Sequence, residues 1–187
     1  MKKIPTLFER EFEGHKIVRT TPNVTPGLEW VLEGEGFATV KYDGAAAAII
    51  DGVFYKRYDA KKGKTPPDGA IPCGDPDPVT GHWPHWVPVD FQAPQDKHFV
   101  EAYKSSGGAT LIDWTYEVCG PSFRKNPHHF KYNCLIPHGT EVLTVGRSYE
   151  EIRDYLQHTP IEGIVFWKDG EPCCKIKRTD FGFQWPI

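Results

Sequence analysis

The sequence lacks any apolar run of the length that a membrane-spanning helix needs, and only a short apolar stretch separates the N-terminal Met-Lys-Lys from Glu9 and Arg10. A membrane span takes about 20 consecutive apolar residues, and a secretory signal peptide needs a longer apolar core than this one. The absence of both features predicts a protein with no membrane partner that resides in the cytoplasm. We expect it to be a monomer.

The sequence also lacks the cysteine pattern of a disulfide scaffold or a structural zinc site. The chain has five cysteines, an odd number, and no Cys-x-x-Cys pair. Disulfide-rich scaffolds and structural zinc sites depend on such pairs. Cys173 and Cys174 are adjacent, and a strand would direct them to opposite faces. The sequence therefore predicts reduced, mostly buried thiols and no structural zinc.

Positive charge is not in excess. The 22 Lys and Arg residues stand against 25 Asp and Glu residues, so the formal net charge is −3 and the surface as a whole does not attract a polyanion. Nucleic acid would have to be held by a local cluster of cations, and either cluster could equally be solvated loop charge. The first cluster is Lys56, Arg57, Lys61, Lys62 and Lys64, and the second is Arg124, Lys125, His128, His129 and Lys131.

Aromatic residues, glycine and proline are abundant: six Trp, eight Tyr, eleven Phe, 18 Gly and 17 Pro. This composition favours short strands and shaped loops over long helices. The 187 residues, 39% of them hydrophobic, suffice for one globular domain with a real core. We expect a single domain over residues 1–187 with an α+β fold, built mainly from antiparallel sheets with flanking helices.

Two Asp-Gly dipeptides, Asp51-Gly52 and Asp169-Gly170, each separate a pair of apolar runs and predict hairpins. In the second hairpin, alternation puts two lysines on one face of a mostly apolar strand, where lysine is costly without an anionic partner. The predicted strands are residues 37–40, 45–50, 53–57, 110–118, 163–167 and 172–177.

Two helices are predicted. Thr25-Pro26 resembles an N-cap followed by proline at the first helical position, which starts a short helix through Leu32. The tetrad Ser148-Tyr149-Glu150-Glu151 has the spacing of a capping box and opens the second helix. Between residues 65 and 94, frequent prolines predict a long structured loop without regular secondary structure.

Charged residues follow one another at positions that suit phosphoryl transfer. A lysine could attack phosphorus, carboxylates could hold its metal, and further cations could hold the leaving phosphates. Each signal is weak alone, and their order and spacing carry the inference. The residues are Lys41, in the run Lys41-Tyr42-Asp43-Gly44, then Glu117, Glu162, Lys175 and Lys177.

This order resembles the covalent nucleotidyltransferase superfamily of DNA ligases, RNA ligases and mRNA capping enzymes. The likeness runs from about Val40 to the last residue, and several segments resemble those of vertebrate RNA ligase 1 and its relatives, which are ATP-dependent RNA ligases. Two departures stand out. The vertebrate enzyme continues beyond Ile187, and it has valine-histidine where this chain has Ile176-Lys177. The segments that carry the closer likeness are GHWPHWVPV (81–89), LIPHG (135–139), IEGIV (161–165) and GFQWPI (182–187).

The resemblance implies the nucleotidyltransferase fold of a ligase adenylation domain and a reaction in three steps. The lysine takes AMP from ATP, passes it to an RNA 5′-phosphate, and the RNA 3′-hydroxyl displaces AMP to seal the strand, as in RNA repair. Only ten residues follow Lys177. We therefore expect no separate C-terminal oligonucleotide-binding domain and expect one of the two basic clusters to hold the RNA.

The resemblance also assigns roles to residues. Lys41 is the nucleophile, while Lys175 and Lys177 neutralise charge on the phosphates during displacement. Glu117 and Glu162 supply hard oxygen ligands for Mg²⁺ or Mn²⁺. Arg57 grips the sugar or a phosphate, and Asp43 and Gly44 shape the loop after the nucleophile. The ATP site implied in this way consists of Val40, Lys41, Arg57, Glu117, Glu162, Lys175 and Lys177.

Three alternatives remain open. A capping-type guanylyltransferase would use the same lysine with GTP. A DNA ligase would seal a nick with a DNA 3′-hydroxyl end. A nucleotide-binding or RNA-binding module without catalytic activity would keep the pocket and form no covalent intermediate.

Overall fold

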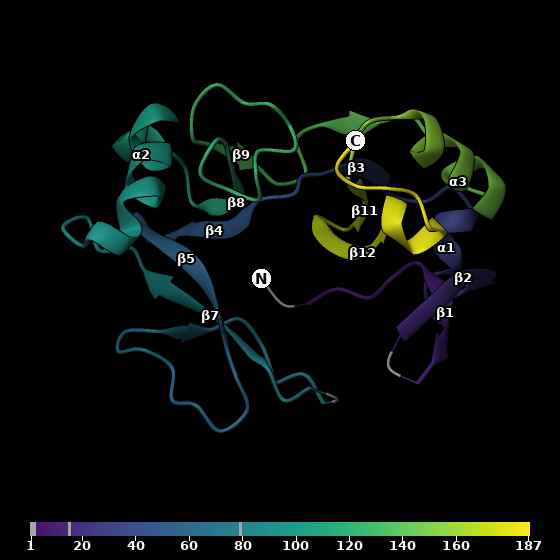
Figure 1. The fold of residues 1–187 in the computed structure, drawn as a ribbon, viewed down its shortest axis with the longest axis horizontal. Helices are drawn as coiled ribbons and strands as arrows, with labels where there is room; N and C mark the ends of the chain where they lie inside the picture. Colours follow the sequence, from purple (N-terminus) through teal and green to yellow (C-terminus); the bar gives the residue numbers. More distant parts are fainter. Residues whose placement is uncertain (1–2, 15, 79) are drawn as a thin grey trace. The chain divides into compact units, whose positions relative to one another are not determined.

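The computed structural model describes residues 3–14, 16–78 and 80–187. These residues form an α+β fold of mostly antiparallel sheets with three α-helices, which confirms the predicted fold class (Figure 1). None of the described helices has the length and apolar character needed to cross a membrane. The chain divides into two compact units, unit 1 (Asp43–His138, with Lys3) and unit 2 (Ile4–Tyr42 and Gly139–Ile187). The single domain over residues 1–187 stays a prediction.

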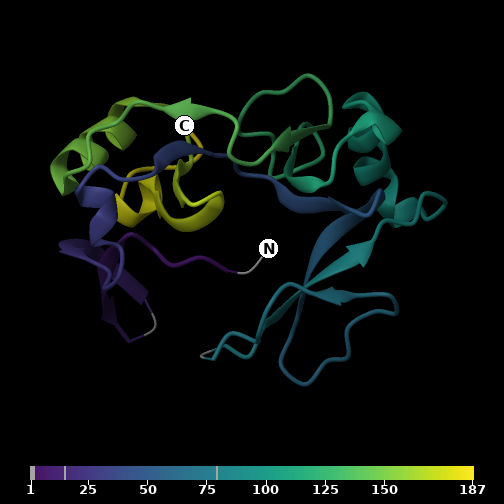
Figure 2. The same cartoon turned by 180° about the vertical axis from the view of Figure 1, so that it is seen from behind.

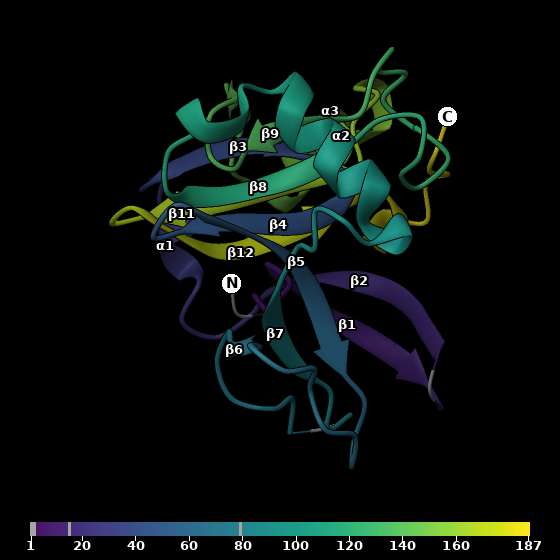
Figure 3. The ribbon, with the colours of Figure 1, turned by 90° about the vertical axis from the view of Figure 1, so that its left-hand side faces the viewer.

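Unit 1 is built on a six-stranded antiparallel sheet in the order β6-β7-β5-β4-β8-β9. The helix α2 (Lys97–Ser105), preceded by the 3₁₀ turn η1 (Pro94–Asp96), covers one face of this sheet (Figure 3). The 3₁₀ turn η2 (Gly108–Thr110) leads on to β8. The strands are β4 (Ala45–Ile50), β5 (Val53–Ala60), β6 (Ile71–Pro72), β7 (Trp83–Pro88), β8 (Trp114–Cys119) and β9 (Cys134–Pro137).

The core of unit 1 lies between α2 and the sheet. Val100 and Ala102 of α2 pack against alternate residues of the central strands, among them Ala47, Tyr116 and Val118. Because successive side chains of a strand point to opposite faces, Glu117 lies on the face that α2 does not cover. Burial of the apolar face therefore fixes where Glu117 points.

Unit 2 combines segments from both ends of the chain. Its four-stranded antiparallel sheet has the order β10-β3-β11-β12, and a separate hairpin joins β1 to β2 (Figures 1 and 2). The strands are β1 (Phe8–Glu13), β2 (Lys16–Val24), β3 (Phe37–Lys41), β10 (Val142–Leu143), β11 (Gly163–Lys168) and β12 (Glu171–Lys177). The helical elements are α1 (Glu29–Leu32), α3 (Tyr149–His158) and the 3₁₀ turn η3 (Arg178–Phe181).

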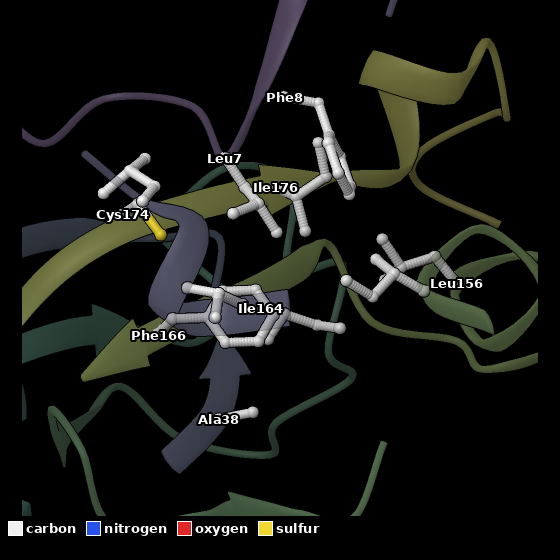
Figure 4. Packing of buried hydrophobic residues seen from close by; sticks show 11 residues of the cluster. Leu7, Phe8, Ala38, Leu156, Ile164, Phe166, Cys174 and Ile176 are labelled. Atoms are coloured by element: carbon white, nitrogen blue, oxygen red, sulfur yellow. The ribbon is translucent and has the colours of Figure 1, made fainter. Parts of the chain in front are cut away.

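The core of unit 2 lies on one face of this four-stranded sheet. Figure 4 shows Ile164, Phe166 and Ile176 of the sheet gathered with Leu156 of α3 and Leu7 of the N-terminal segment, and all five are fully buried. Burying a side chain of this size stabilises a fold by about 1.5–3 kcal/mol. The opposite face carries Lys41, Thr39 and Val165, and the buried Trp167 donates there to the Thr39 hydroxyl at 2.9 Å.

The locally encoded elements follow the sequence prediction. Both hairpins form around the expected turns, where Asp51 and Gly52 have φ of 50° and 73°, and Asp169 and Gly170 have φ of 52° and 79°. Ser148 caps α3 with the predicted capping box. All five cysteines are free; Cys119 and Cys174 are buried and the other three are half-buried.

Three predicted elements differ. The helix predicted from Thr25 to Leu32 spans only Glu29–Leu32, because the Thr25 hydroxyl donates to the Thr6 carbonyl at 2.7 Å instead of capping a helix. The strand predicted over residues 110–118 begins at Trp114, and Ile112, within the predicted range, is 71% exposed. The segment 65–94 contains two strands, β6 and β7, where a loop was predicted.

The strand β7 forms despite two prolines. The N–H of Val89 donates to the Phe54 carbonyl at 2.9 Å, which sets the alternation of hydrogen bonds between β7 and β5. By that alternation the nitrogens of Pro84 and Pro88 point away from β5, where no N–H is required for this ladder. The prolines therefore remove no bond between the two strands, which the sequence alone could not indicate.

Candidate functional site

The face of the four-stranded sheet opposite the unit 2 core carries three lysines, and strand register puts them side by side. Gly163 of β11 pairs with Lys41 on one side and with Lys177 on the other, so the three residues form one row across the sheet. In the next row, Val165 pairs with Thr39 and with Lys175. Directly opposed residues in an antiparallel pair share a face. We call the face defined by Lys41, Glu162, Lys175 and Lys177 the lysine face.

Gly163 permits the close approach of the strands in this row. A Cβ atom at position 163 would lie 2.3 Å from the carbonyl oxygen of Ile176 and 2.9 Å from the Cα of Lys177. A side chain there would push β12 away from β11. Val40 is buried and, by alternation along β3, points to the face opposite Lys41.

Lys41, the last residue of β3, forms an ion pair with Glu162. Its Nζ lies 2.5 Å from Glu162 Oε2, and the two side chains are only 23% and 11% exposed. The carbonyl of Glu162 accepts the N–H of Arg178 at 2.9 Å, which holds this residue at the end of the β11–β12 ladder. The predicted nucleophile and one predicted metal ligand are therefore in direct contact.

Lys175 lies in an unfavourable environment for a cation. Burial, together with the positive charges of Lys41 and Lys177, lowers the pKa of Lys175 to about 8, against the opposing attraction of Glu162. Its backbone is fixed on both sides, because β12 pairs with β11 and Lys175 also exchanges two hydrogen bonds with residues 5–7. A half-buried cluster of like charges is a place where an anion would bind favourably.

Two residues that the sequence analysis did not single out support the lysine face. Asp180, only 4% exposed, accepts the backbone N–H of Lys177 at 2.8 Å and pairs with the guanidinium of Arg10 at 2.6 Å. The Nε atom of Arg10 is buried and has no hydrogen-bond partner among the described residues. Arg10 lies in the forty residues without a family resemblance, so no sequence signal pointed to it.

In unit 1, Glu117 is held by two hydrogen bonds. The backbone N–H of Gly44 donates to Oε1 at 3.0 Å, and His138 Nε2 lies 3.0 Å from Oε2. The other ring nitrogen of His138 lies 3.0 Å from the Thr115 hydroxyl. An ionised carboxylate only accepts, so Nε2 carries the proton of the bond to Glu117. We call Thr115, Glu117 and His138, with Gly44, the glutamate cluster.

The residues that follow Lys41 in the chain are tied to this cluster. At Gly44, a Cβ atom would lie 2.2 Å from the carbonyl oxygen of Val118, so only glycine allows the approach to β8. The N–H of Asp43 donates to His128 Nε2 at 2.9 Å, and Arg124 Nε donates to the Gly44 carbonyl at 3.2 Å. These bonds give Asp43 and Gly44 a fixed conformation in unit 1.

Arg57 lies on β5, and on the same face of the sheet as Glu117. The strand β4 separates β5 from β8, and its small residues Ala46 and Ala48 occupy that face between them. The guanidinium forms an ion pair with Asp59 at 2.7 Å and lies 6.0 Å from the ring of Trp86. On this face, the two alanines of β4 therefore lie between the Arg57 guanidinium and the Glu117 carboxylate.

The predicted site residues thus fall into two groups, each described within its own unit. Unit 2 brings together Lys41, Glu162, Lys175 and Lys177, and unit 1 brings together Asp43, Gly44 and Glu117, with Arg57 on the same face as Glu117. Comparison with known proteins found no protein-family model and no curated protein that matches the chain. The chemistry of these residues is therefore the basis for a functional assignment.

Proposed function

We propose that this protein is an ATP-dependent RNA ligase that acts through a covalent lysyl-AMP intermediate, and that its sheets are those of a nucleotidyltransferase fold. The observation that carries the proposal is the lysine face. A lysine amine at the end of a rigid strand is paired with a buried carboxylate and flanked by two further lysines. Such a cluster suits a reaction in which an amine attacks phosphorus while a polyphosphate leaves.

In the first step, Lys41 Nζ attacks the α-phosphorus of ATP, the P–N bond forms, and the P–O bond to pyrophosphate breaks. Attack requires the lone pair of the amine, so Lys41 must first transfer its proton to solvent, which ends its ion pair with Glu162. Lys175 and Lys177 stabilise the negative charge that gathers on the leaving pyrophosphate. A phosphate bound at Lys175 also returns the cation to a favourable environment.

In the later steps, the lysyl-AMP is used to seal RNA. An oxygen of the RNA 5′-phosphate attacks the AMP phosphorus and releases the Lys41 amine. The RNA 3′-hydroxyl then attacks the activated 5′-phosphate, a phosphodiester bond forms and AMP leaves. Within the glutamate cluster, Glu117 contacts the nucleoside sugar, and Arg57 contacts the sugar or a phosphate.

The residues fit a divalent metal ion. The described residues contain no group of three His, Cys, Asp or Glu side chains that could hold a metal ion alone. Mg²⁺ is usually held by one or two carboxylates together with substrate phosphates, so Glu162 in unit 2 and Glu117 in unit 1 each have the chemistry of a ligand. When bound, Mg²⁺ or Mn²⁺ would neutralise charge on the phosphates.

The test is incubation with α-labelled ATP of the wild type, Lys41→Ala and Lys41→Arg. We expect label on the wild type only, because arginine keeps the positive charge but remains protonated and cannot attack. Intact mass should rise by one AMP. Label retained on Lys41→Ala would refute the assignment of the nucleophile.

The same assay separates the alternatives. Label from GTP in preference to ATP would indicate a capping-type enzyme. Equal sealing of an end whose terminal ribose is replaced by deoxyribose would indicate a DNA ligase, since the 2′-hydroxyl distinguishes RNA from DNA. Absence of any nucleotide adduct would indicate a binding module.

A further inference from the structure

One segment of unit 1, residues 120–133 between β8 and β9, concentrates positive charge without any acidic residue. We call it the basic loop. Arg124, Lys125 and Lys131 lie at its surface, and Tyr132 is 75% exposed. Neither Lys125 nor Lys131 forms an ion pair within the described residues of unit 1. The loop therefore presents cations and an aromatic ring to solvent.

The conformation of the basic loop is fixed by its own side chains. Asn126 exchanges two hydrogen bonds with the backbone of Phe130, at 2.8 and 2.9 Å. Asn133, only 8% exposed, accepts the N–H of Ser122 at 3.1 Å and donates to Glu101 at 2.8 Å. Phe123 anchors the loop in the core beneath α2. A surface that is already ordered loses less entropy when a ligand binds.

The backbone of the loop is also strained where its charges lie. Arg124, Lys125 and Asn126 have φ of 47°, 61° and 53°, three successive residues in the left-handed region that ordinary side chains avoid. Each such residue costs about 1 kcal/mol or more and persists only where the surroundings enforce it. Of the two cations in this strained stretch, Arg124 is held by Gly44 and Asp43, and Lys125 is exposed to solvent.

Two bonds tie the basic loop to the segment that follows the proposed nucleophile. His128 accepts the N–H of Asp43, and Arg124 donates to the carbonyl of Gly44. Asp43 is two residues beyond Lys41 in the chain. A ligand on this loop would therefore contact residues whose positions are linked to the first residues after Lys41.

The other basic cluster is organised differently. Lys56 pairs with the buried carboxylate of Asp96, and Arg57 pairs with Asp59 at 2.7 Å. Only Lys61, Lys62 and Lys64 of this cluster are exposed. Arg124 of the basic loop likewise pairs with Asp43 at 3.8 Å, so each set combines paired cations with exposed lysines, and the basic loop adds the exposed ring of Tyr132.

We propose that the basic loop is the surface that binds single-stranded RNA, with Lys125 and Lys131 contacting phosphates and Tyr132 stacking on an unpaired base. Spaced cations beside an exposed aromatic ring are the pattern by which proteins hold single strands. Base pairing would hide the faces of the bases, so duplex RNA fits this surface less well. That this RNA is the strand to be sealed rests on the proposed function.

The test measures binding of a fluorescent single-stranded RNA with a 5′-phosphate as salt is varied. The variant Lys125→Gln/Lys131→Gln is compared with the matched variant Lys61→Gln/Lys62→Gln. Loss of two phosphate contacts lowers the slope of log affinity against log salt by about 1.4 and weakens binding about tenfold at low salt. The matched variant should retain the wild-type slope. Melting temperature is measured on each preparation to verify folding.

Variants of Tyr132 test the stacking contact independently of the phosphate contacts. Tyr132→Ala should weaken binding about tenfold with an unchanged salt slope, whereas Tyr132→Phe should bind as the wild type, because stacking needs the ring and not the hydroxyl. Equal binding by Tyr132→Ala and the wild type would contradict the stacking contact. A duplex of the same sequence should bind the wild type more weakly than the single strand does. Its affinity should also fall less when Tyr132 is replaced by alanine.

Failure of this inference is distinguishable from failure of the proposed function. If the wild type takes up AMP but Lys125→Gln/Lys131→Gln binds RNA as well as Lys61→Gln/Lys62→Gln does, the basic loop is not the RNA surface and the ligase proposal stands. If no AMP adduct forms but RNA binding depends on the basic loop, the proposed RNA surface is supported and the ligase proposal fails. If the wild type shows no measurable binding of single-stranded RNA, the proposal that the basic loop binds RNA is wrong.

Discussion

At the scale of single residues, Lys175 works against the stability of the fold. A lysine whose pKa falls from 10.5 to about 8 on folding binds its proton less tightly in the folded state than in the unfolded state. Between these two values the unfolded state carries more protons, so this residue makes stability rise with pH across that window. Below the window its full destabilising effect is present. Selection for stability alone would not keep such a residue, which supports a role in binding anions.

The first prediction concerns Lys175→Met. Methionine matches the unbranched lysine side chain out to Cε and lacks the charged amine, so the variant should be more stable than the wild type by about 2–3 kcal/mol near neutral pH. The difference should shrink as the pH rises through about 8 towards 10.5. Urea unfolding at several pH values measures both. Parallel pH profiles for the two proteins would contradict the depressed pKa.

The second prediction concerns His138, a positioning residue in the glutamate cluster. His138→Ala removes the donor to one oxygen of Glu117, and loss of a hydrogen bond to a charged group costs about 1.5–3 kcal/mol. Under the proposed function, the ATP concentration for half-maximal lysyl-AMP formation should rise at least about tenfold. The maximal rate should change much less, since Glu117 binds the nucleoside and does not attack.

Thr115→Val is the matched control for His138. It removes the bond to the outer ring nitrogen and leaves the bond to Glu117 in place. We expect an increase of about two- to fivefold in the ATP requirement, corresponding to one neutral hydrogen bond. An effect of Thr115→Val as large as that of His138→Ala would argue that the cluster supports only the fold.

At the scale of secondary-structure elements, the site depends on how closely β11 approaches β12. The third prediction compares Gly163→Ala with Gly170→Ala in the same hairpin. Position 163 is crowded by the Ile176 carbonyl, while position 170 has open space around it and a φ of 79°. Gly163→Ala should destabilise by about 1–3 kcal/mol through overpacking, and Gly170→Ala by about 1 kcal/mol through backbone strain.

The two variants should differ in function more than in stability. Gly163→Ala separates the row that contains Lys41 and Lys177, so lysyl-AMP formation should fall at least about tenfold, while Gly170→Ala should react normally. Urea unfolding and labelled-ATP assays on the same preparations test this. A parallel loss of activity and stability in both variants would show that β11–β12 spacing has no special role.

The elements that could be predicted from sequence are those with local signals. The Asp-Gly turns and the Ser148 capping box are encoded within a few residues and formed as expected. The strand β7 was missed because the tolerance for Pro84 and Pro88 depends on which neighbour each nitrogen faces. The direction of each proline nitrogen is set by the strands that pair with β7 and cannot be read from the sequence of β7 alone.

The candidate site was predictable to a similar extent. Alternation correctly put Lys175 and Lys177 on one face, because the period of a strand is local. The contact of Lys41 with Glu162 joins residues that are 121 positions apart, and only strand register shows it. Arg10 and Asp180 were missed because their importance arises from an ion pair across the unit.

At the scale of the whole molecule, the two units differ in how the chain builds them. The sheet of unit 1 uses only strands between β4 and β9, all within Asp43–His138. The sheet of unit 2 needs β3 from the N-terminal segment and β10, β11 and β12 from the C-terminal segment. Unit 2 therefore forms only after loop closure across the whole of unit 1, which carries an entropic cost.

The fourth prediction follows from this topology. A fragment of residues 43–138 contains the complete six-stranded sheet and the core beneath α2, so it should fold alone with a cooperative thermal transition. A fragment of residues 1–138 should show the same single transition, because β3 then lacks β10 and β11, its two partners. Circular dichroism and calorimetry measure the transitions. A fragment 43–138 without cooperative unfolding would show that unit 1 depends on unit 2. Addition of a separate peptide of residues 139–187 to fragment 1–138 should produce a second transition, since the peptide supplies the three missing strands of the four-stranded sheet.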